Sequence, residues 1–258
     1  MSQPTYAALG QFCWPEIASS DIAATKDFYT RIFGWEPVDL PSAIGPYTIF
    51  KCRELDAAAA YQLNPQQTAR PRWNSYVAVE SADQAAKKAR ELGGSVVMEP
   101  FDVEGVMRMA IIHDPGGAKL CLWQSLSHFG AGIFGKPGSL CWTELATRDT
   151  KQAMAFYSGL FGWEGQAKEQ GEFVYTELWL DNVAIGGMLG MEGTAWEGMP
   201  EQWTPYFAVE DCEAIARAAE SLNASLLSPP TDIPGVGRFA MIRDPQGAVF
   251  SVIKLAEQ

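Results

Sequence analysis

The chain has 258 residues, 47% of them hydrophobic, and a formal net charge of −12. This length is enough for two domains of ordinary size, each with its own core. Nucleic acids and anionic membranes are bound through clustered Lys and Arg, so the acidic balance argues against both as partners. No apolar run reaches the roughly 18–20 residues of a membrane span, and the opening MSQPTYAAL lacks the regions of a signal peptide. We therefore expect a cytoplasmic protein.

Cysteine and tryptophan are the informative residue types. The five cysteines are scattered and have no CxxC spacing, which favours free thiols in a reducing compartment over disulfides or a cysteine zinc site. A buried Trp needs a partner for its ring N–H. We therefore expect several of the nine tryptophans to line a concave surface or an interface, with ordinary core packing as the alternative.

The sequence is duplicated. Residues 12–36 read FCWPEIASSDIAATKDFYTRIFGWE, and residues 140–164 read LCWTELATRDTKQAMAFYSGLFGWE. A second pair of blocks follows, WNSYVAVESADQAAKKARELGG from Trp73 and WTPYFAVEDCEAIARAAESLNA from Trp203. A period of about 130 residues is too long for a solenoid and indicates two copies of one compact domain.

Each copy begins with a strand and a helix. Residues alternate from Gln11 to Ala18, which predicts a strand with Trp14 and Glu16 on one face. Asp21 is placed as the N-cap of a helix that ends at Gly34. Three short strands then follow, and their pattern is clearer in the second copy.

The same unit occurs twice within each copy. A strand from Trp73 leads to a helix capped by Ser81 and stopped at Gly93, and three more strands follow. In the second copy Asn223, which tolerates the left-handed conformation, replaces that glycine. A segment rich in Gly and Ser separates the copies. We predict a domain over residues 1–125, a linker over 126–139 and a domain over 140–258.

Three motifs occur at matching places in both copies: CWxE on the first strand, FYxxxFGW closing the first helix, and DPxG before the last strand. Four βαβββ units with these motifs resemble a tandem member of the vicinal oxygen chelate superfamily, which includes glyoxalase I, extradiol dioxygenases and bleomycin-resistance proteins. The resemblance spans residues 11–255 and is greatest to two-domain glyoxalase-like proteins of bacteria. It implies an α+β fold with two tandem glyoxalase-like domains, each an incomplete barrel around a cavity.

The metal enzymes of that superfamily hold their ion with His and Glu on particular strands. The resemblance carries three of these positions, in the two copies, onto Trp14 and Trp142, Asn74 and Thr204, and Cys121 and Ser251. The fourth falls in AAAAYQL or AIGGML, which contain neither carboxylate nor imidazole. Trp offers no lone pair, and Asn, Thr and Ser are weak ligands. The two histidines, His113 and His128, lie at none of these positions. We expect no metal and no cofactor, with displaced ligands as the alternative.

The inward positions instead form an aromatic cup, which suits a small apolar or aromatic molecule held by a few polar groups. The predicted ligand-binding residues are Trp14, Asn74, Tyr76, Cys121, Trp123, Trp142, Thr204, Tyr206 and Ser251. Alternation also places Lys119, Val249 and Ile253 on this face. The alternative is that Trp14 and Trp142 fill the former metal pocket as core residues.

Glu16 and Glu144 are the candidate catalytic residues. A carboxylate beside Trp and Tyr loses hydration, its pKa rises, and it can then act as a general base next to a carbonyl. The alternative is a structural Glu that accepts from a tyrosine hydroxyl or a backbone N–H. Cys121 has no base nearby in the pattern and is expected to be inert. The first hypothesis is therefore a metal-free small-molecule binding protein, and the second is a lyase or isomerase that uses a Glu base.

Other features leave alternatives open. The loop 194–205 carries Trp196, Met199 and Trp203, and we expect it to border the better of two unequal pockets, unless it packs on the linker or on the other domain. Arg108 and Arg238 either clamp an anion or form structural salt bridges. The units sharing a cavity lie either within one domain or across the two copies, and the protein is expected to be a monomer or a homodimer.

Overall fold

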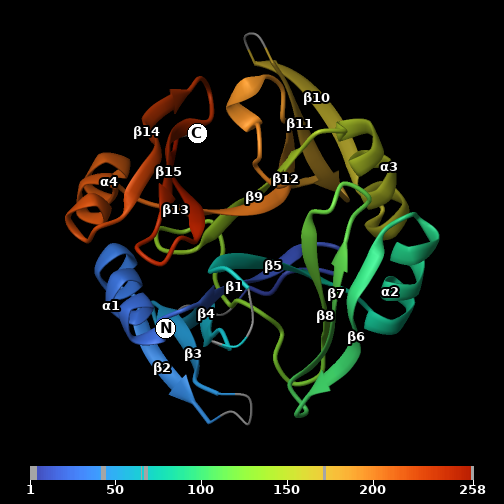
Figure 1. Cartoon of the computed structure of the whole chain (residues 1–258), viewed down its shortest axis with the longest axis horizontal. Helices are drawn as coiled ribbons and strands as arrows, with labels where there is room; N and C mark the ends of the chain where they lie inside the picture. Colours follow the sequence, from blue (N-terminus) through green and yellow to red (C-terminus); the bar gives the residue numbers. More distant parts are fainter. Residues whose placement is uncertain (1–4, 42–44, 65, 67–68, 171–172, 257–258) are drawn as a thin grey trace.

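The computed structural model describes residues 5–41, 45–64, 66, 69–170 and 173–256. These residues form two eight-stranded sheets, with strand orders β2-β3-β4-β1-β5-β8-β7-β6 and β10-β11-β12-β9-β13-β16-β15-β14. Figure 1 shows one sheet in each half of the molecule, with helices on the outside. No helix in these ranges is long and apolar enough to span a bilayer.

The two halves have the same element order. The first half contains β1 Phe12–Ser19, α1 Ile22–Phe33, β2 Glu36–Leu40, β3 Tyr47–Cys52, β4 Leu55–Gln62, β5 Arg72–Ala78, α2 Ala82–Glu91, β6 Ser95–Val103, β7 Met107–His113 and β8 Lys119–Ser125. The second contains β9 Leu140–Thr147, α3 Thr150–Phe161, β10 Glu164–Gln170, β11 Phe173–Leu180, β12 Val183–Gly190, the 3-10 helix η1 Thr194–Trp196, β13 Gln202–Ala208, α4 Cys212–Ser221, β14 Ser225–Ile233, β15 Gly237–Arg243 and β16 Val249–Leu255. The α+β fold of four βαβββ units is confirmed.

The two units of each half share one sheet. β1 pairs antiparallel with β5, so that Glu16 lies opposite Asn74, and β5 pairs parallel with β8. Trp14 and Cys121 consequently belong to one buried cluster. The units therefore pair within a copy, which decides between the two arrangements that the sequence leaves open.

The helix ends follow the predicted capping. The Asp21 carboxylate accepts a hydrogen bond of 3.0 Å from the Ala24 N–H, and Gly34 ends α1 with a left-handed φ of 68°. In the third unit, Asp149 caps α3 in the same way through the Gln152 N–H, at 2.9 Å. Figure 1 shows α1 beside α4 and α3 beside α2. The first helix of each half therefore lies at the junction between the halves.

Tryptophans fill this junction. One continuous apolar core runs through both halves, and in it the Trp35 ring N–H donates to the Gly138 carbonyl at 2.7 Å. Trp163 donates to the Gly10 carbonyl, also at 2.7 Å. Trp203, expected in a loop over the pocket, instead lies buried in β13 and donates to the Tyr157 hydroxyl at 2.9 Å. That expectation was wrong because the strand begins at Gln202 and turns Trp203 toward the core.

Candidate functional site

The concave face of the first sheet is filled. Its predicted ligand-binding residues are all buried, with exposed fractions of 0% for Cys121, 1% for Trp14, 2% for Trp123, 3% for Tyr76 and 4% for Asn74. Lys119, expected on the same face, is partly exposed. The chain after β8 covers this face. The His128 ring packs edge-on against Trp14 at 5.1 Å between centroids, and the Ala131 N–H donates to the Cys13 carbonyl at 2.8 Å.

Glu16 lies beneath this cover and is 4% exposed. Its carboxylate accepts hydrogen bonds from the hydroxyls of Tyr76 at 2.7 Å and Tyr47 at 3.1 Å. Burial raises the pKa of Glu16, although these hydroxyls oppose the rise. Its environment matches the structural alternative, a Glu satisfied by tyrosines, because each carboxylate oxygen accepts from one tyrosine hydroxyl.

The concave face of the second sheet differs. Trp142 and Glu144 are both partly exposed, while Thr204, Tyr206 and Ser251, on the neighbouring strands β13 and β16, are buried. The Tyr206 hydroxyl donates to Glu144 at 3.0 Å. Burial raises the pKa of Glu144, against the hydrogen bonds from Tyr175 and Tyr206.

The residue missed from the sequence is Tyr175, on β11. Its hydroxyl accepts a hydrogen bond of 2.8 Å from the Trp142 ring N–H and also contacts Glu144. Tyr47 holds the matching place in the first sheet, where it donates to Glu16. The two tyrosines stand at the same offset as the two glutamates, so the duplication itself carried the signal for this Trp, Tyr and Glu group.

The loop after β12 is tied to the end of β9. The Arg148 guanidinium donates to the carbonyls of Trp196 at 3.3 Å and Met199 at 2.8 Å. Arg148 also lies 3.8 Å from a carboxylate oxygen of Glu201. Trp196 and Met199 thus belong to a loop held by Arg148, just past the end of β9. This loop lines neither of the two grooves that border the second half, so the expectation that it borders the better pocket stays a prediction.

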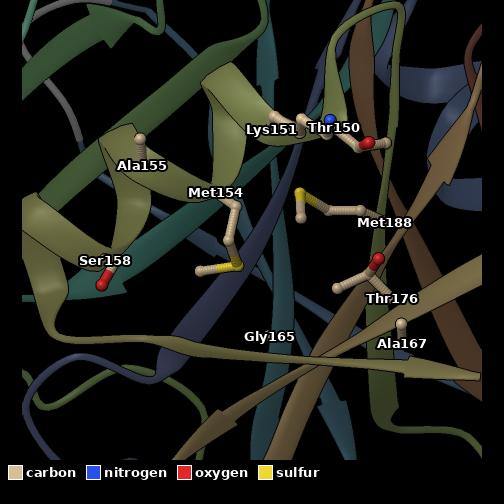
Figure 2. A pocket seen from close by; sticks show the side chains of 9 residues that line it. All are labelled: Thr150, Lys151, Met154, Ala155, Ser158, Gly165, Ala167, Thr176 and Met188. Carbon is tan, nitrogen blue, oxygen red and sulfur yellow. The ribbon is translucent and has the colours of Figure 1, made fainter.

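Two grooves border the second half. One, of about 300 Å³, lies between Thr5–Ala7, residues 134–135 and the first residues of β9 and β12, and Trp142 is among the residues that line it. The other, of about 450 Å³, lies between α3 and the strands β10 to β12. Figure 2 shows Met154 and Met188 facing each other across this second groove.

The α3 groove has a filled counterpart in the first half. There Lys26 replaces Met154 and forms a 2.9 Å ion pair with Asp39. Thr48 also donates to that carboxylate, at 2.6 Å. In the second copy Met154 and Ala167 replace Lys26 and Asp39. The charged network is therefore absent there, and the groove is lined by these apolar side chains.

Arg108 and Arg238 form ion pairs on the outer side of each sheet. Arg108 contacts Asp83 at 2.6 Å and Asp102 at 2.9 Å. Arg238 contacts Asp232 at 2.8 Å and also pairs with Glu213. Both arginines thus serve as structural salt bridges, one of the two alternatives left open by the sequence.

Two tandem sheets built from βαβββ units, with the same motifs in each, match a known family model. The model of the "Glyoxalase/Bleomycin resistance protein/Dioxygenase superfamily" matches residues 9–122 and again 139–252. The chain belongs to this superfamily. The resemblance noted from the sequence motifs is thereby confirmed.

Relatives of this superfamily member align over nearly its whole length. It is 36% identical to the "Putative glyoxylase CFP32" of Mycobacterium tuberculosis, over 95% of both chains. It is also 36% identical to the anthracycline biosynthesis protein DauV of Streptomyces sp. strain C5, over 98% of this chain and 96% of DauV. Its fold is similar to the Mn(II)-bound glyoxalase of Novosphingobium aromaticivorans, with a TM-score of 0.68, 17% identity, and coverage of 100% and 84% of the two chains.

The side chains at the superfamily's ligand positions do not fit a divalent metal. Trp14 packs as core, and the Asn74 amide oxygen is taken by Lys119, whose ammonium donates to it at 2.9 Å. Burial raises the pKa of Cys121 to about 11, which keeps its thiol protonated near neutral pH. Within the described ranges, no three His, Cys, Asp or Glu side chains come together as a metal site would require.

Proposed function

We propose that this superfamily member binds a small, flat aromatic molecule on the concave face of its second sheet, without a metal in the site. One observation carries the proposal, the contrast between the two copies. Trp14 is 1% exposed under the cover of His128, whereas Trp142 at the matching place is partly exposed and borders a groove.

The polar groups around Trp142 suit a ligand with hydroxyl or carbonyl substituents. An indole face stacks with an aromatic ring, and the Tyr175 hydroxyl and the Glu144 carboxyl lie beside it to exchange hydrogen bonds. The relationship to two anthracycline biosynthesis proteins, DauV and DnrV, supports an aromatic ligand of this kind.

The test is a calorimetric titration with a dihydroxyanthraquinone, using Trp142→Leu and the matched variant Trp14→Leu. We expect saturable binding to the native protein and at least a tenfold rise in Kd for Trp142→Leu, because the stacking surface is lost. Trp14→Leu lowers stability but leaves Kd within about twofold, since that residue is covered. Equal losses in both variants, or flat titrations across a broad set of aromatic compounds, would contradict the proposal.

A second candidate function is a lyase or isomerase with Glu144 as its base. The observation that favours it is a carboxyl group with a raised pKa on the partly exposed face. The measurement is solvent deuterium exchange, followed by NMR, at the carbon next to the carbonyl of an aryl ketone that binds. Glu144→Gln should abolish exchange and preserve binding, whereas the matched Glu16→Gln should not affect it. Exchange that persists in Glu144→Gln excludes this role.

A further inference from the structure

A row of polar side chains crosses four adjacent strands at one end of the first sheet. His113 on β7 lies in register with Lys119 on β8. The Lys119 ammonium donates to the Asn74 side chain on β5 at 2.9 Å, and Asn74 lies opposite Glu16 on β1. These four residues lie on the concave face, because they alternate with residues directed at the helices.

Two further polar residues flank the row. Arg72 and Tyr61 lie on either side of Ala18, Arg72 on β5 and Tyr61 on β4. The Tyr61 hydroxyl lies 3.4 Å from the Asn74 amide nitrogen. Three basic side chains, Arg72, His113 and Lys119, therefore gather at this end of the sheet, and each of them is partly exposed.

Their positive charges are poorly neutralised. Among the described residues, neither Arg72 nor Lys119 has a carboxylate oxygen within 4.0 Å, whereas Arg108 and Arg238 each have two carboxylate partners. The Arg72 Nε atom is buried and has no hydrogen-bond partner among those residues. Two acids act on the cluster, Glu16 on Lys119 and Asp114 on His113. The Glu16 oxygens already accept from Tyr76 and Tyr47, and Asp114 already accepts from the Tyr157 hydroxyl.

The electrostatics of the cluster favour the addition of a negative charge. Burial lowers the pKa of Lys119, and the charge of Arg72 adds to this fall, while Cys121 and Glu16 oppose it. His113 is affected in the same direction, by burial first and then by Lys119. Each of these shifts would be relieved by an anion among the three side chains, because a negative charge stabilises their protonated forms.

The second copy shows that the fold does not need this cluster. The places of Arg72, Asn74 and Lys119 are taken there by Gln202, Thr204 and Val249, with the same strand pairing. Leu189 replaces Tyr61. His113 is matched by Arg243, which pairs with Val249. The second sheet nevertheless forms without the charges of Arg72 and Lys119. The free-energy cost of burying those two charges in the first sheet therefore points to a role beyond folding.

We propose that this end of the first sheet binds a small anion, the carboxylate or phosphate group of a metabolite, through Arg72 and Lys119. Asn74 and Tyr61 supply neutral hydrogen-bonding groups, and His113 supplies a third basic side chain. The cup beneath is filled, so the anionic group binds at the rim and the rest of the molecule stays outside. This site is separate from the aromatic site around Trp142 and does not depend on it.

The experiment uses the full chain with inorganic phosphate and acetate as probes at constant ionic strength. NMR of the two histidine rings provides the readout. We expect one or both anions to shift the His113 resonances saturably, while the His128 resonances, from a ring hydrogen-bonded to Asp56, stay unchanged. Saturation by phosphate alone or by acetate alone identifies the group that the site accepts. No saturable shift of His113 with either anion overturns the proposal.

The test variants introduce, in the first copy, the residues that the second copy has at the matching positions. The double variant Arg72→Gln with Lys119→Val carries the residues found there and should weaken anion binding at least tenfold. The control, Lys87→Gln with Lys88→Gln, makes the same change in net charge on the exposed face of α2 and should leave binding within about twofold. If anion binding weakens equally in both double variants, the effect comes from the net charge of the protein and not from a specific site. If the double variant does not fold, Lys119→Met alone replaces it.

Discussion

Tyr29 donates a 3.0 Å hydrogen bond to Asp244, which lies in the other copy. The mirror contact joins Tyr157 to Asp114 at 2.9 Å. Each tyrosine belongs to the FYxxxFGW motif and each aspartate to the DPxG turn. The FYxxxFGW and DPxG motifs are therefore hydrogen-bonded to each other across the junction. These contacts hold the two copies together as one packed molecule.

Removing one hydroxyl from this junction should lower stability measurably. Tyr29→Phe leaves one oxygen of the buried Asp244 and the Trp73 ring N–H without their partner. An unsatisfied buried polar group costs about 1–3 kcal/mol, so the free energy of unfolding in urea should fall by that amount. The control is Tyr6→Phe, at a half-exposed tyrosine. A loss no larger than in the control would show that the contact contributes nothing.

Much of the fold followed from the sequence because its signals are local or repeated. The caps Asp21 and Asp149 and the glycine at 34 act within one helical turn, and the duplication turned each weak pattern into a paired observation. The cover over Trp14 could not be predicted in this way. It depends on where a Gly-rich segment runs after β8, and neither its periodicity nor its composition specifies that path.

The candidate site was predicted less completely, for a similar reason. Alternation along each strand was enough to place Trp142, Glu144 and Tyr206 on one face, and the strand pairing agrees with it. Tyr175 reaches that face because β11 pairs with β12 and β12 pairs with β9. The pairing of β12 with β9 joins strands that are far apart in the sequence. The unequal exposure of Trp14 and Trp142 depends on distant segments and could be seen only in three dimensions.

The cover over the first sheet should depend on Gly130. This residue has a φ of +87°, and a Cβ there would lie 2.5 Å from the Cys13 carbonyl oxygen. Gly130→Ala therefore adds a clash, worth about 1–3 kcal/mol, to the strain of a left-handed alanine. It should also increase acrylamide quenching of tryptophan fluorescence, as Trp14 and Trp123 lose their cover.

The matched control for that variant is Gly135→Ala, a few residues later on the same segment. Its φ is +66°, but a Cβ there meets nothing within 4 Å. It should suffer only the backbone strain and should not increase quenching. If both variants lose the same stability and show the same acrylamide quenching of tryptophan fluorescence, the close approach of Gly130 to Cys13 does not hold the segment against β1.

Stability should depend on pH through Glu16. Burial raises its folded-state pKa above the ordinary value of 4.5, so the folded protein holds this proton more tightly than the unfolded chain. That contribution is complete below pH 4.5 and is lost as pH rises through the folded pKa, at about 1.4 kcal/mol for each unit of elevation. Glu16→Gln cannot ionise, so its stability relative to the native protein should increase from pH 4 to pH 7. The exposed Glu80→Gln is the control, and parallel pH profiles for all three proteins would refute the prediction.

The last prediction concerns the space that lets Tyr175 reach Trp142. A Cβ on Gly187 would overlap the Tyr175 hydroxyl group, whereas the matching position in the first copy is the buried Ala59. Gly187→Ala should therefore displace Tyr175 and weaken dihydroxyanthraquinone binding about tenfold, while Gly190→Ala, whose Cβ would meet its nearest atom at 3.7 Å, should leave it unchanged. Calorimetry of both variants decides. Unaltered binding in Gly187→Ala would remove Tyr175 from the proposed site and leave Trp142 to hold the ligand with Glu144 alone.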